Sequence, residues 1–139
     1  MALCLDTSAA LRWLVPQPSS AAAGAVIEQA FRRGEPVVAP PLLYAEATSV
    51  LRRFVFDAVL LPGEARATLQ DLLSLPIRIV SGQPIYLRAF DLASQFQQAR
   101  AYDTQYIAVA EDQGATLLTA DGVMFKRSLS IGVMAQLLT

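Results

Sequence analysis

The sequence predicts an α/β fold built around a parallel, doubly wound sheet. Short apolar runs typical of buried strands alternate with segments of helical periodicity. Acidic residues directly follow two of these runs, and ligand sites of open α/β sheets lie beyond the carboxyl ends of their strands. With 139 residues, 54% of them hydrophobic and 17% charged, the chain is expected to form one globular domain, residues 1–139.

The predicted strands are short apolar segments without the alternation of a half-exposed strand. Strands of a parallel sheet are covered on both faces, and they therefore read as nearly continuous apolar runs. The five expected strands are residues 2–5, 36–39, 76–80, 115–118 and 131–134.

The predicted helices lie between these strands, and proline or glycine marks several of their ends. Proline suits the first positions of a helix, as at Pro41 and Pro84, and Gly114 is placed to end the helix before the fourth strand. The expected helices are residues 9–15, 20–33, 42–59, 64–73, 84–98, about 103–113 and a short helix after 121.

Composition excludes several classes of chemistry. The chain has no histidine and a single cysteine, Cys4, so it has no intrachain disulfide, no Ser-His-Asp or Cys-His catalytic group and no ordinary zinc site. No apolar run approaches the roughly 20 residues that span a bilayer. The N-terminus lacks a basic region and carries Asp6 within its apolar stretch, so no signal peptide is expected and a cytoplasmic location is the default.

Four acidic residues are candidates for one site. Asp6 and Asp121 follow the first and fourth strands, Glu46 lies on the helix after the second strand, and Asp103 lies on the helix before the fourth. If the first strand is central, all four can converge above its carboxyl edge. Two such charges 4 Å apart repel by ~4 kcal/mol at an effective dielectric near 20. A cluster of four therefore calls for proton uptake or a bound divalent cation, and hard oxygen ligands favour Mg²⁺ or Mn²⁺.

Each acid also has a structural interpretation. Asp6, Asp103 and Asp121 all stand where a helix is expected to begin, and aspartate is a good N-cap. Glu46 has no cation three or four residues away on its own helix, so a purely structural role would need a partner from elsewhere, such as Arg12 or Arg100.

The contexts of the four acids resemble those of a known family. The resemblance rests on four segments: Asp6 after the first strand, PPLLYAEATSVLRR with Glu46, AYDTQYIAVAE with Asp103 and LLTAD with Asp121. In order and spacing they resemble the PIN-domain ribonucleases, in particular the VapC toxins of VapBC-type toxin–antitoxin pairs, over nearly the whole chain.

The resemblance implies a three-layer α/β/α PIN-like domain with strand order 3-2-1-4-5. It implies a Mg²⁺- or Mn²⁺-dependent endoribonuclease, the toxin of a type II pair, with Asp6, Glu46, Asp103 and Asp121 as the acidic quartet that holds the metal and a water for phosphodiester cleavage. Thr7, Ser8 and Thr119 are then expected to hydrogen-bond the ligands. The implied partners are RNA, a cognate antitoxin and a second copy of the chain, with no membrane.

Two basic pairs, Arg52-Arg53 and Lys126-Arg127, follow Glu46 and Asp121. They are candidates for RNA phosphate contacts, although solvated helix ends are the commoner explanation of such pairs.

Other functions remain in competition. One is a catalytically inactive PIN-like module that binds protein or RNA. Another is a different α/β enzyme or signalling domain with an acidic pocket, but position 8 is Ser where a haloacid dehalogenase-type phosphatase needs Asp. Val80-Ser81-Gly82 supplies no phosphoacceptor for a receiver domain, and no phosphate-binding glycine loop is present.

Overall fold

A five-stranded parallel sheet forms the centre of the protein. The computed structural model describes residues 1–139. The strands are β1 (Leu3–Leu5), β2 (Val37–Ala39), β3 (Arg78–Ile79), β4 (Thr116–Thr119) and β5 (Ala135–Leu137). Their order is β3-β2-β1-β4-β5, and every pair is parallel. The predicted fold class and strand order are therefore confirmed.

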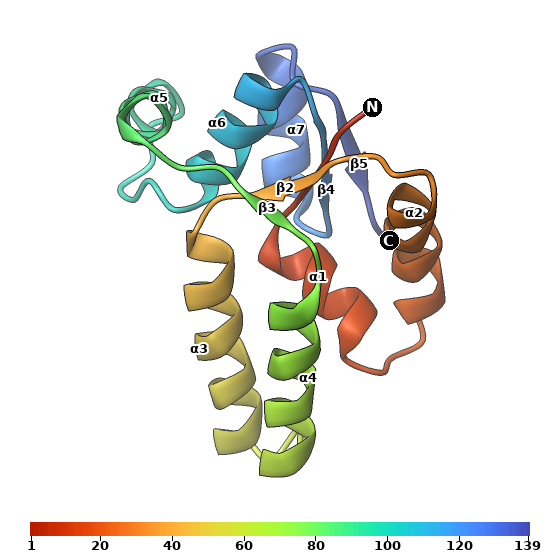
Figure 1. Ribbon diagram of the computed structural model, residues 1–139. Coiled ribbons are helices and arrows are strands. Elements are labelled where there is room, and N and C mark those ends of the chain that lie inside the picture. The colour runs from red at the N-terminus through yellow and green to blue at the C-terminus, as the bar shows by residue number, and fades with distance from the viewer.

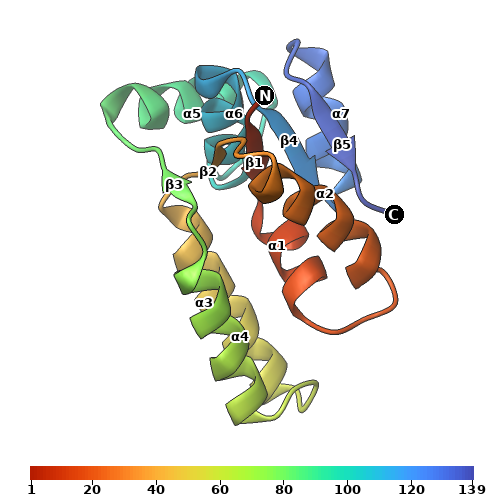
Figure 2. The ribbon, with the colours of Figure 1, turned by 45° about the vertical axis from the view of Figure 1, so that its right-hand side comes forward.

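Seven helices connect the strands and cover the sheet. They are α1 (Thr7–Leu14), α2 (Ser20–Arg32), α3 (Leu42–Phe56), α4 (Pro62–Ser74), α5 (Gln83–Gln95), α6 (Asp103–Gln113) and α7 (Gly122–Ser130). α1 and α2 pack together on one face, and α5, α6 and α7 lie on the other, which makes three layers (Figures 1 and 2). α3 and α4 form an antiparallel hairpin that projects beyond the carboxyl ends of β1 and β2 (Figure 1). No helix is both long enough and apolar enough to cross a bilayer.

The direction of winding reverses beside β1. The chain moves from β1 to β2 and β3 on one side of the sheet, then crosses to β4 and β5 on the other. Right-handed crossovers place the connections of the two halves on opposite faces. The gap between the carboxyl ends of β1 and β4 is the topological switch point, where open α/β sheets bind their ligands.

The core is one contiguous cluster with α6 at its centre. Tyr106, Ile107 and Val109 are each no more than 1% exposed. α6 packs against β1, β2 and β4 on its inner side and against α5 on its outer side. Gly114 ends the helix in the left-handed region, with φ 58°, as expected of a glycine C-cap. Because both sides of α6 are covered, the position of its first residue, Asp103, is fixed.

The last predicted strand is in the wrong place. Residues 131–134 were expected to form it, whereas β5 is Ala135–Leu137. α7 continues to Ser130, and Gly132 turns the chain with φ 79° while the amide of Val133 donates to the carbonyl of Ser128. The apolar run therefore serves to end a helix. β5 itself is half-exposed at the sheet edge, so its composition lacks the continuous apolar signal of an inner strand.

Some helix ends also differ from prediction. The third helix was expected to reach residue 59 but ends at Phe56, and the fifth was expected to reach residue 98 but ends at Gln95. In both cases a residue other than glycine adopts the left-handed region shortly after the helix, Ala58 at φ 57° and Gln97 at φ 55°. Side-chain periodicity does not signal such a backbone reversal.

Candidate functional site

A cavity of about 420 Å³ opens at the switch point, and all four candidate acids line it. Asp6 follows β1, Asp121 follows β4, Glu46 projects from α3 and Asp103 is the first residue of α6. The structure therefore brings together four carboxylates that lie up to 115 residues apart in the sequence. The other residues that line the cavity are Thr7, Ser8, Leu11, Arg12, Gln17, Val50, Phe54, Tyr106 and Met124.

Asp6 is the most deeply buried of the four acids, at 3% exposed. Its Oδ1 accepts hydrogen bonds from the Ala9 amide at 2.8 Å and from Ser8 Oγ at 2.7 Å. Its Oδ2 accepts one from Thr119 Oγ1 at 2.5 Å. Asp6 is thus the N-cap of α1, as its structural interpretation predicted, but two hydroxyl groups also fix its carboxylate in the wall of the cavity.

Ser8 and Thr119 link the ends of β1 and β4. The Ala120 amide donates to Ser8 Oγ at 2.9 Å, and the Asp121 amide donates to Thr119 Oγ1 at 3.0 Å. Both hydroxyl groups also contact Asp6, so one small network sets the relative positions of Asp6 and Asp121. This network holds the two strand-end acids in place through the residues for which a supporting role was expected.

Glu46 has polar partners but no cation. Its Oε1 accepts hydrogen bonds from Thr7 Oγ1 at 3.1 Å and from the Tyr106 hydroxyl at 2.5 Å. The salt bridges of the chain involve none of the four acids, so neither Arg12 nor Arg100 neutralises Glu46. Arg12 lines the same cavity but donates to Ser19 Oγ.

Asp121 and Asp103 differ in how far the protein satisfies them. Asp121 caps α7, because its Oδ1 accepts from the amides of Val123 and Met124. Asp103 was also a candidate N-cap, but the capping position of α6 is Tyr102, and Asp103 makes no side-chain hydrogen bond. Both oxygens of Asp103 are therefore free to face the cavity.

The acids influence one another's protonation. Burial raises the pKa of Asp6 to about 6, an effect that the charge of Asp121 increases and the hydrogen bonds to the carboxylate partly oppose. Burial also raises the pKa of Asp103, and repulsion from Asp121 and Glu46 adds to this effect. Arg127 acts in the opposite direction on Asp103. Repulsion thus acts between Asp6 and Asp121 and between Asp103 and both Asp121 and Glu46.

The arrangement is not a closed coordination cage. No group of three or more His, Cys, Asp or Glu side chains is positioned to hold a metal ion directly. The available ligands nevertheless fit a hard divalent cation. The acids of the cavity offer carboxylate oxygens, and those of Asp103 accept no hydrogen bond within the protein. An ion that keeps several of its waters suits such a cavity, and Mg²⁺ characteristically does so.

The basic pairs lie in different surroundings. Arg52 lines a separate groove between α3 and α4, and Arg53 pairs with Asp57 at 2.8 Å. Neither Arg52 nor Arg53 lines the acidic cavity, and their contact with RNA phosphates stays a prediction. Lys126 is exposed, whereas Arg127 lines a second cavity that also includes Asp103.

Tyr106 is the residue that sequence reasoning missed. Its spacing marks it as a core position, and it is indeed 1% exposed. Its hydroxyl nevertheless reaches the cavity, contacts Glu46, and lies 2.8 Å from Thr7 Oγ1. The only signal in the sequence is that the apolar stripe below Asp103 contains a side chain with a polar tip.

Together, the fold and the cavity define a class of α/β/α domain that gathers carboxylates at the switch point beside its central strand. The family model described as PIN domain matches residues 3–128, which is most of the chain. The chain therefore belongs to the PIN domain family, and the resemblance seen in the sequence is confirmed.

Individual relatives agree with this assignment. Ribonuclease VapC12 of Mycobacterium tuberculosis is 32% identical over 120 residues, which cover 86% of this chain and 87% of the relative. The crystal structure of VapBC2 from Rickettsia felis bound to a promoter DNA fragment matches with a TM-score of 0.74 at 15% identity, over the full length of both chains. VapBC-1 from nontypeable Haemophilus influenzae matches with a TM-score of 0.65 at 18% identity, covering 99% and 98% of the two chains. At these identities the two structures establish the fold of this chain and nothing further.

Proposed function

We propose that this protein is a divalent-metal-dependent endoribonuclease and the toxin of a type II toxin–antitoxin pair. The observation that carries the proposal is the convergence of four acids on one cavity, none of which forms a salt bridge with a basic group. These acids are Asp6, Glu46, Asp103 and Asp121. The similarity to a ribonuclease over 86% of the chain supports the reaction class.

The four acids would hold Mg²⁺ or Mn²⁺. When bound, the ion supplies the positive charge that activates a water molecule and offsets the charge that develops on the scissile phosphate. The protein's own part is to fix the donors. Ser8 and Thr119 orient Asp6, and Thr7 and Tyr106 orient Glu46. Such supporting hydrogen bonds keep the carboxylates in one geometry while the RNA enters and leaves.

Divalent ions are expected to stabilise the protein and to switch on its activity. Binding at 100 times the dissociation constant adds about 2.7 kcal/mol to the free energy of unfolding. For a domain of this size that corresponds to a rise in Tm of roughly 10 °C. Thermal unfolding with Mn²⁺, with Mg²⁺ and with EDTA measures the shift, and labelled single-stranded RNA under the same conditions measures cleavage.

The competing interpretation is a catalytically inactive PIN-like module that binds protein or RNA and whose acids only cap helices. It predicts no shift in Tm with divalent ions and no RNA cleavage. It also predicts that replacing all four acids by Asn or Gln leaves the protein's binding behaviour unchanged. Either of the first two results with correctly folded protein would contradict the nuclease proposal.

We also propose that the protein associates with a cognate antitoxin and forms a homodimer. The structural neighbours from two bacteria are VapBC proteins, which supports an antitoxin partner. The expected observation is a small protein, encoded beside this chain, that co-purifies with it and suppresses RNA cleavage. Analytical ultracentrifugation of the chain alone and of the co-expressed pair tests both associations. A monomeric chain would contradict the homodimer, and the absence of a complex with the neighbouring gene product would contradict the antitoxin partner.

A further inference from the structure

A second cavity adjoins the acidic one. It has a volume of about 410 Å³ and lies between the α5–α6 loop and α7. Asp103 lines both cavities, so the two share a wall. The polar residues around the second cavity are Gln97, Gln98, Arg100, Tyr102, Asp103 and Arg127.

The second cavity differs in charge from the first. Arg100 and Arg127 line it, and neither forms a salt bridge within the protein. The guanidinium of Arg127 lies over the ring of Phe96, 5.7 Å from its centroid, which holds this charge beside Asp103. A phosphate group that reaches Asp103 from this side would therefore meet two guanidinium groups that form no salt bridge within the protein.

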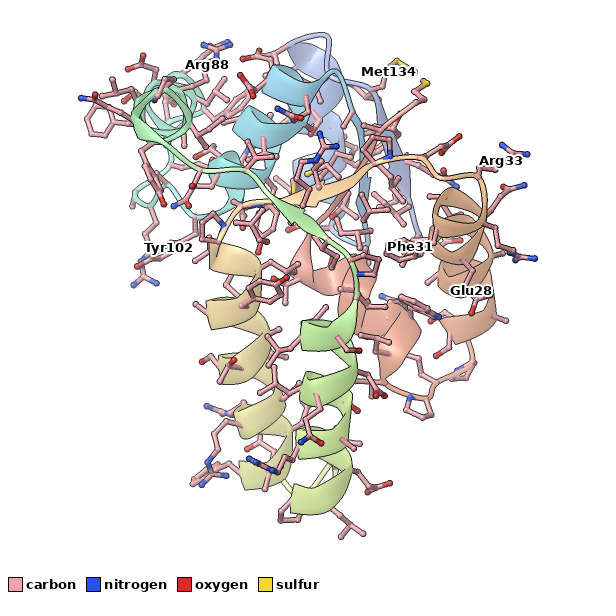
Figure 3. All side chains as sticks on the ribbon, viewed as in Figure 1. Glu28, Phe31, Arg33, Arg88, Tyr102 and Met134 are labelled. Atoms are coloured by element: carbon pink, nitrogen blue, oxygen red, sulfur yellow. The ribbon has the colours of Figure 1, made fainter.

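An aromatic ring and amide groups complete the cavity. Tyr102 is 53% exposed although it directly precedes Asp103, and Figure 3 shows it at the edge of the molecule. Gln98 Oε1 is buried without a hydrogen-bond partner, and it is the only buried side-chain oxygen or nitrogen of the chain in this state. Buried polar atoms are normally satisfied, so this loop carries one hydrogen-bond acceptor that the protein leaves unmet.

The loop that carries these groups also contains an unfavourable backbone conformation. Gln97 adopts φ 55°, in the left-handed region that residues other than glycine rarely occupy. Backbone of this kind is energetically unfavourable and clusters at functional sites. The unpaired acceptor and the unfavourable φ thus occur at neighbouring positions beside Asp103.

We propose that this second cavity binds one nucleotide of single-stranded RNA next to the scissile bond. Its base stacks on Tyr102, and its phosphate lies against Arg100 and Arg127. The proposal rests on the proposed ribonuclease function and names a substrate subsite for it. Bases stack on aromatic side chains in RNA recognition, and arginine is suited to phosphate. An acidic peptide would use the two arginines but would not need the exposed ring of Tyr102.

Replacing Tyr102 by alanine tests the stacking. Loss of one base–aromatic stack is expected to weaken binding of single-stranded RNA by about 5- to 150-fold. Fluorescence anisotropy with a labelled oligoribonucleotide in EDTA measures this without any cleavage. Tyr102→Phe should bind like the wild type, because the ring is kept. Tyr86→Ala is the matched control, since Tyr86 is similarly exposed, at 48%, but lies on α5 outside the cavity.

A second oligomer isolates the role of the base. On a sugar–phosphate strand of equal length without bases, Tyr102→Ala should bind as well as the wild type. Arg100→Ala should weaken binding to both strands and reduce the slope of log K against log salt by about 0.7, the value for one phosphate contact on a single strand. Arg33→Ala, an exposed arginine at the end of α2, should leave the slope unchanged.

The outcomes separate this inference from the nuclease proposal. If the wild-type protein cleaves RNA and Tyr102→Ala leaves the affinity for single-stranded RNA unchanged, the subsite alone is overturned. Binding that depends on Tyr102 in a protein that cuts nothing with Mg²⁺ or Mn²⁺ would overturn the nuclease and retain the binding site. Unchanged RNA binding with weakened antitoxin association in both variants would assign the surface to a protein partner and overturn the subsite.

Discussion

Replacing Asp103 by asparagine is expected to lower RNA cleavage by about a thousandfold or more. Asp103 is the one acid of the cavity whose oxygens make no hydrogen bond within the protein. Its charge is therefore available to an ion or a water molecule, and an amide cannot replace it. Metal-assisted stabilisation of charge is worth several kcal/mol, and each 1.36 kcal/mol corresponds to a factor of ten in rate. Single-turnover cleavage of labelled RNA in Mg²⁺ or Mn²⁺ measures the loss.

Loss of activity must be separated from loss of folding. The pKa of Asp103 is raised by burial and by its acidic neighbours, so the neutral variant should melt at the same temperature as the wild type or higher in EDTA. Asp112→Asn is the matched control, because Asp112 lies on the same helix but is exposed and outside the cavity. If Asp103→Asn and Asp112→Asn cleave RNA equally well, Asp103 has no catalytic role.

A graded variant tests the supporting hydrogen bonds in the same assay. Tyr106→Phe keeps all four carboxylates but removes the hydroxyl that donates to Glu46. Partners of metal-binding side chains typically contribute 10- to 100-fold to affinity or activity. The expected loss is therefore about tenfold, clearly smaller than that of Asp103→Asn. An effect as large as the loss of a carboxylate would place Tyr106 in the chemistry itself.

The convergence of the acids could be predicted because each lies next to a structural landmark in the sequence. Asp6 and Asp121 immediately follow apolar runs, and the carboxyl ends of parallel strands necessarily share one edge of the sheet. Glu46 lies on the helix that follows the second strand, and the lack of a cation near it on that helix argued against a purely structural role; the structure provides no salt bridge from elsewhere. For these residues, local sequence and sheet topology together contain the necessary information.

The rest of the site depends on contacts that local sequence does not encode. Tyr106 contacts Glu46, 60 residues away, only because α6 and α3 meet at the cavity. The second cavity depends on the backbone reversal at Gln97, where the helical pattern was expected to continue to residue 98. The strand expected at residues 131–134 was wrong for a related reason, since a turn at Gly132 uses those apolar residues to end α7.

Asp6 is expected to make the metal-free protein less stable as the pH rises from about 4 to about 6. Its pKa is about 6 in the folded protein and 3.8 as a free side chain, so the folded state binds the proton more tightly than the unfolded state. Between these values the unfolded state loses its proton first, and the free energy of unfolding falls with pH. A difference of about two units corresponds to a loss of at most about 3 kcal/mol, complete above pH 6.

Replacing Asp6 by asparagine should remove this loss. Asparagine can still accept the hydrogen bond from the Ala9 amide as the N-cap of α1, but it carries no charge to bury. Above pH 6 in EDTA, the variant should therefore exceed the wild type by up to about 3 kcal/mol, whereas below pH 4 the two should converge. Urea unfolding at intervals from pH 4 to pH 8 measures the difference. Asp71→Asn, at an exposed position of α4, controls for the loss of an ordinary carboxylate.

A divalent ion should reverse the advantage of the variant, and this reversal connects stability with function. Near pH 7 the ion binds the charged quartet of the wild type and restores stability to it, whereas Asp6→Asn binds the ion weakly and gains little. Sites that carry out chemistry are often destabilising for the empty fold. If Asp6→Asn follows the pH profile of the wild type, or if both proteins gain equally from Mn²⁺, the buried charge of Asp6 is not what the ion compensates.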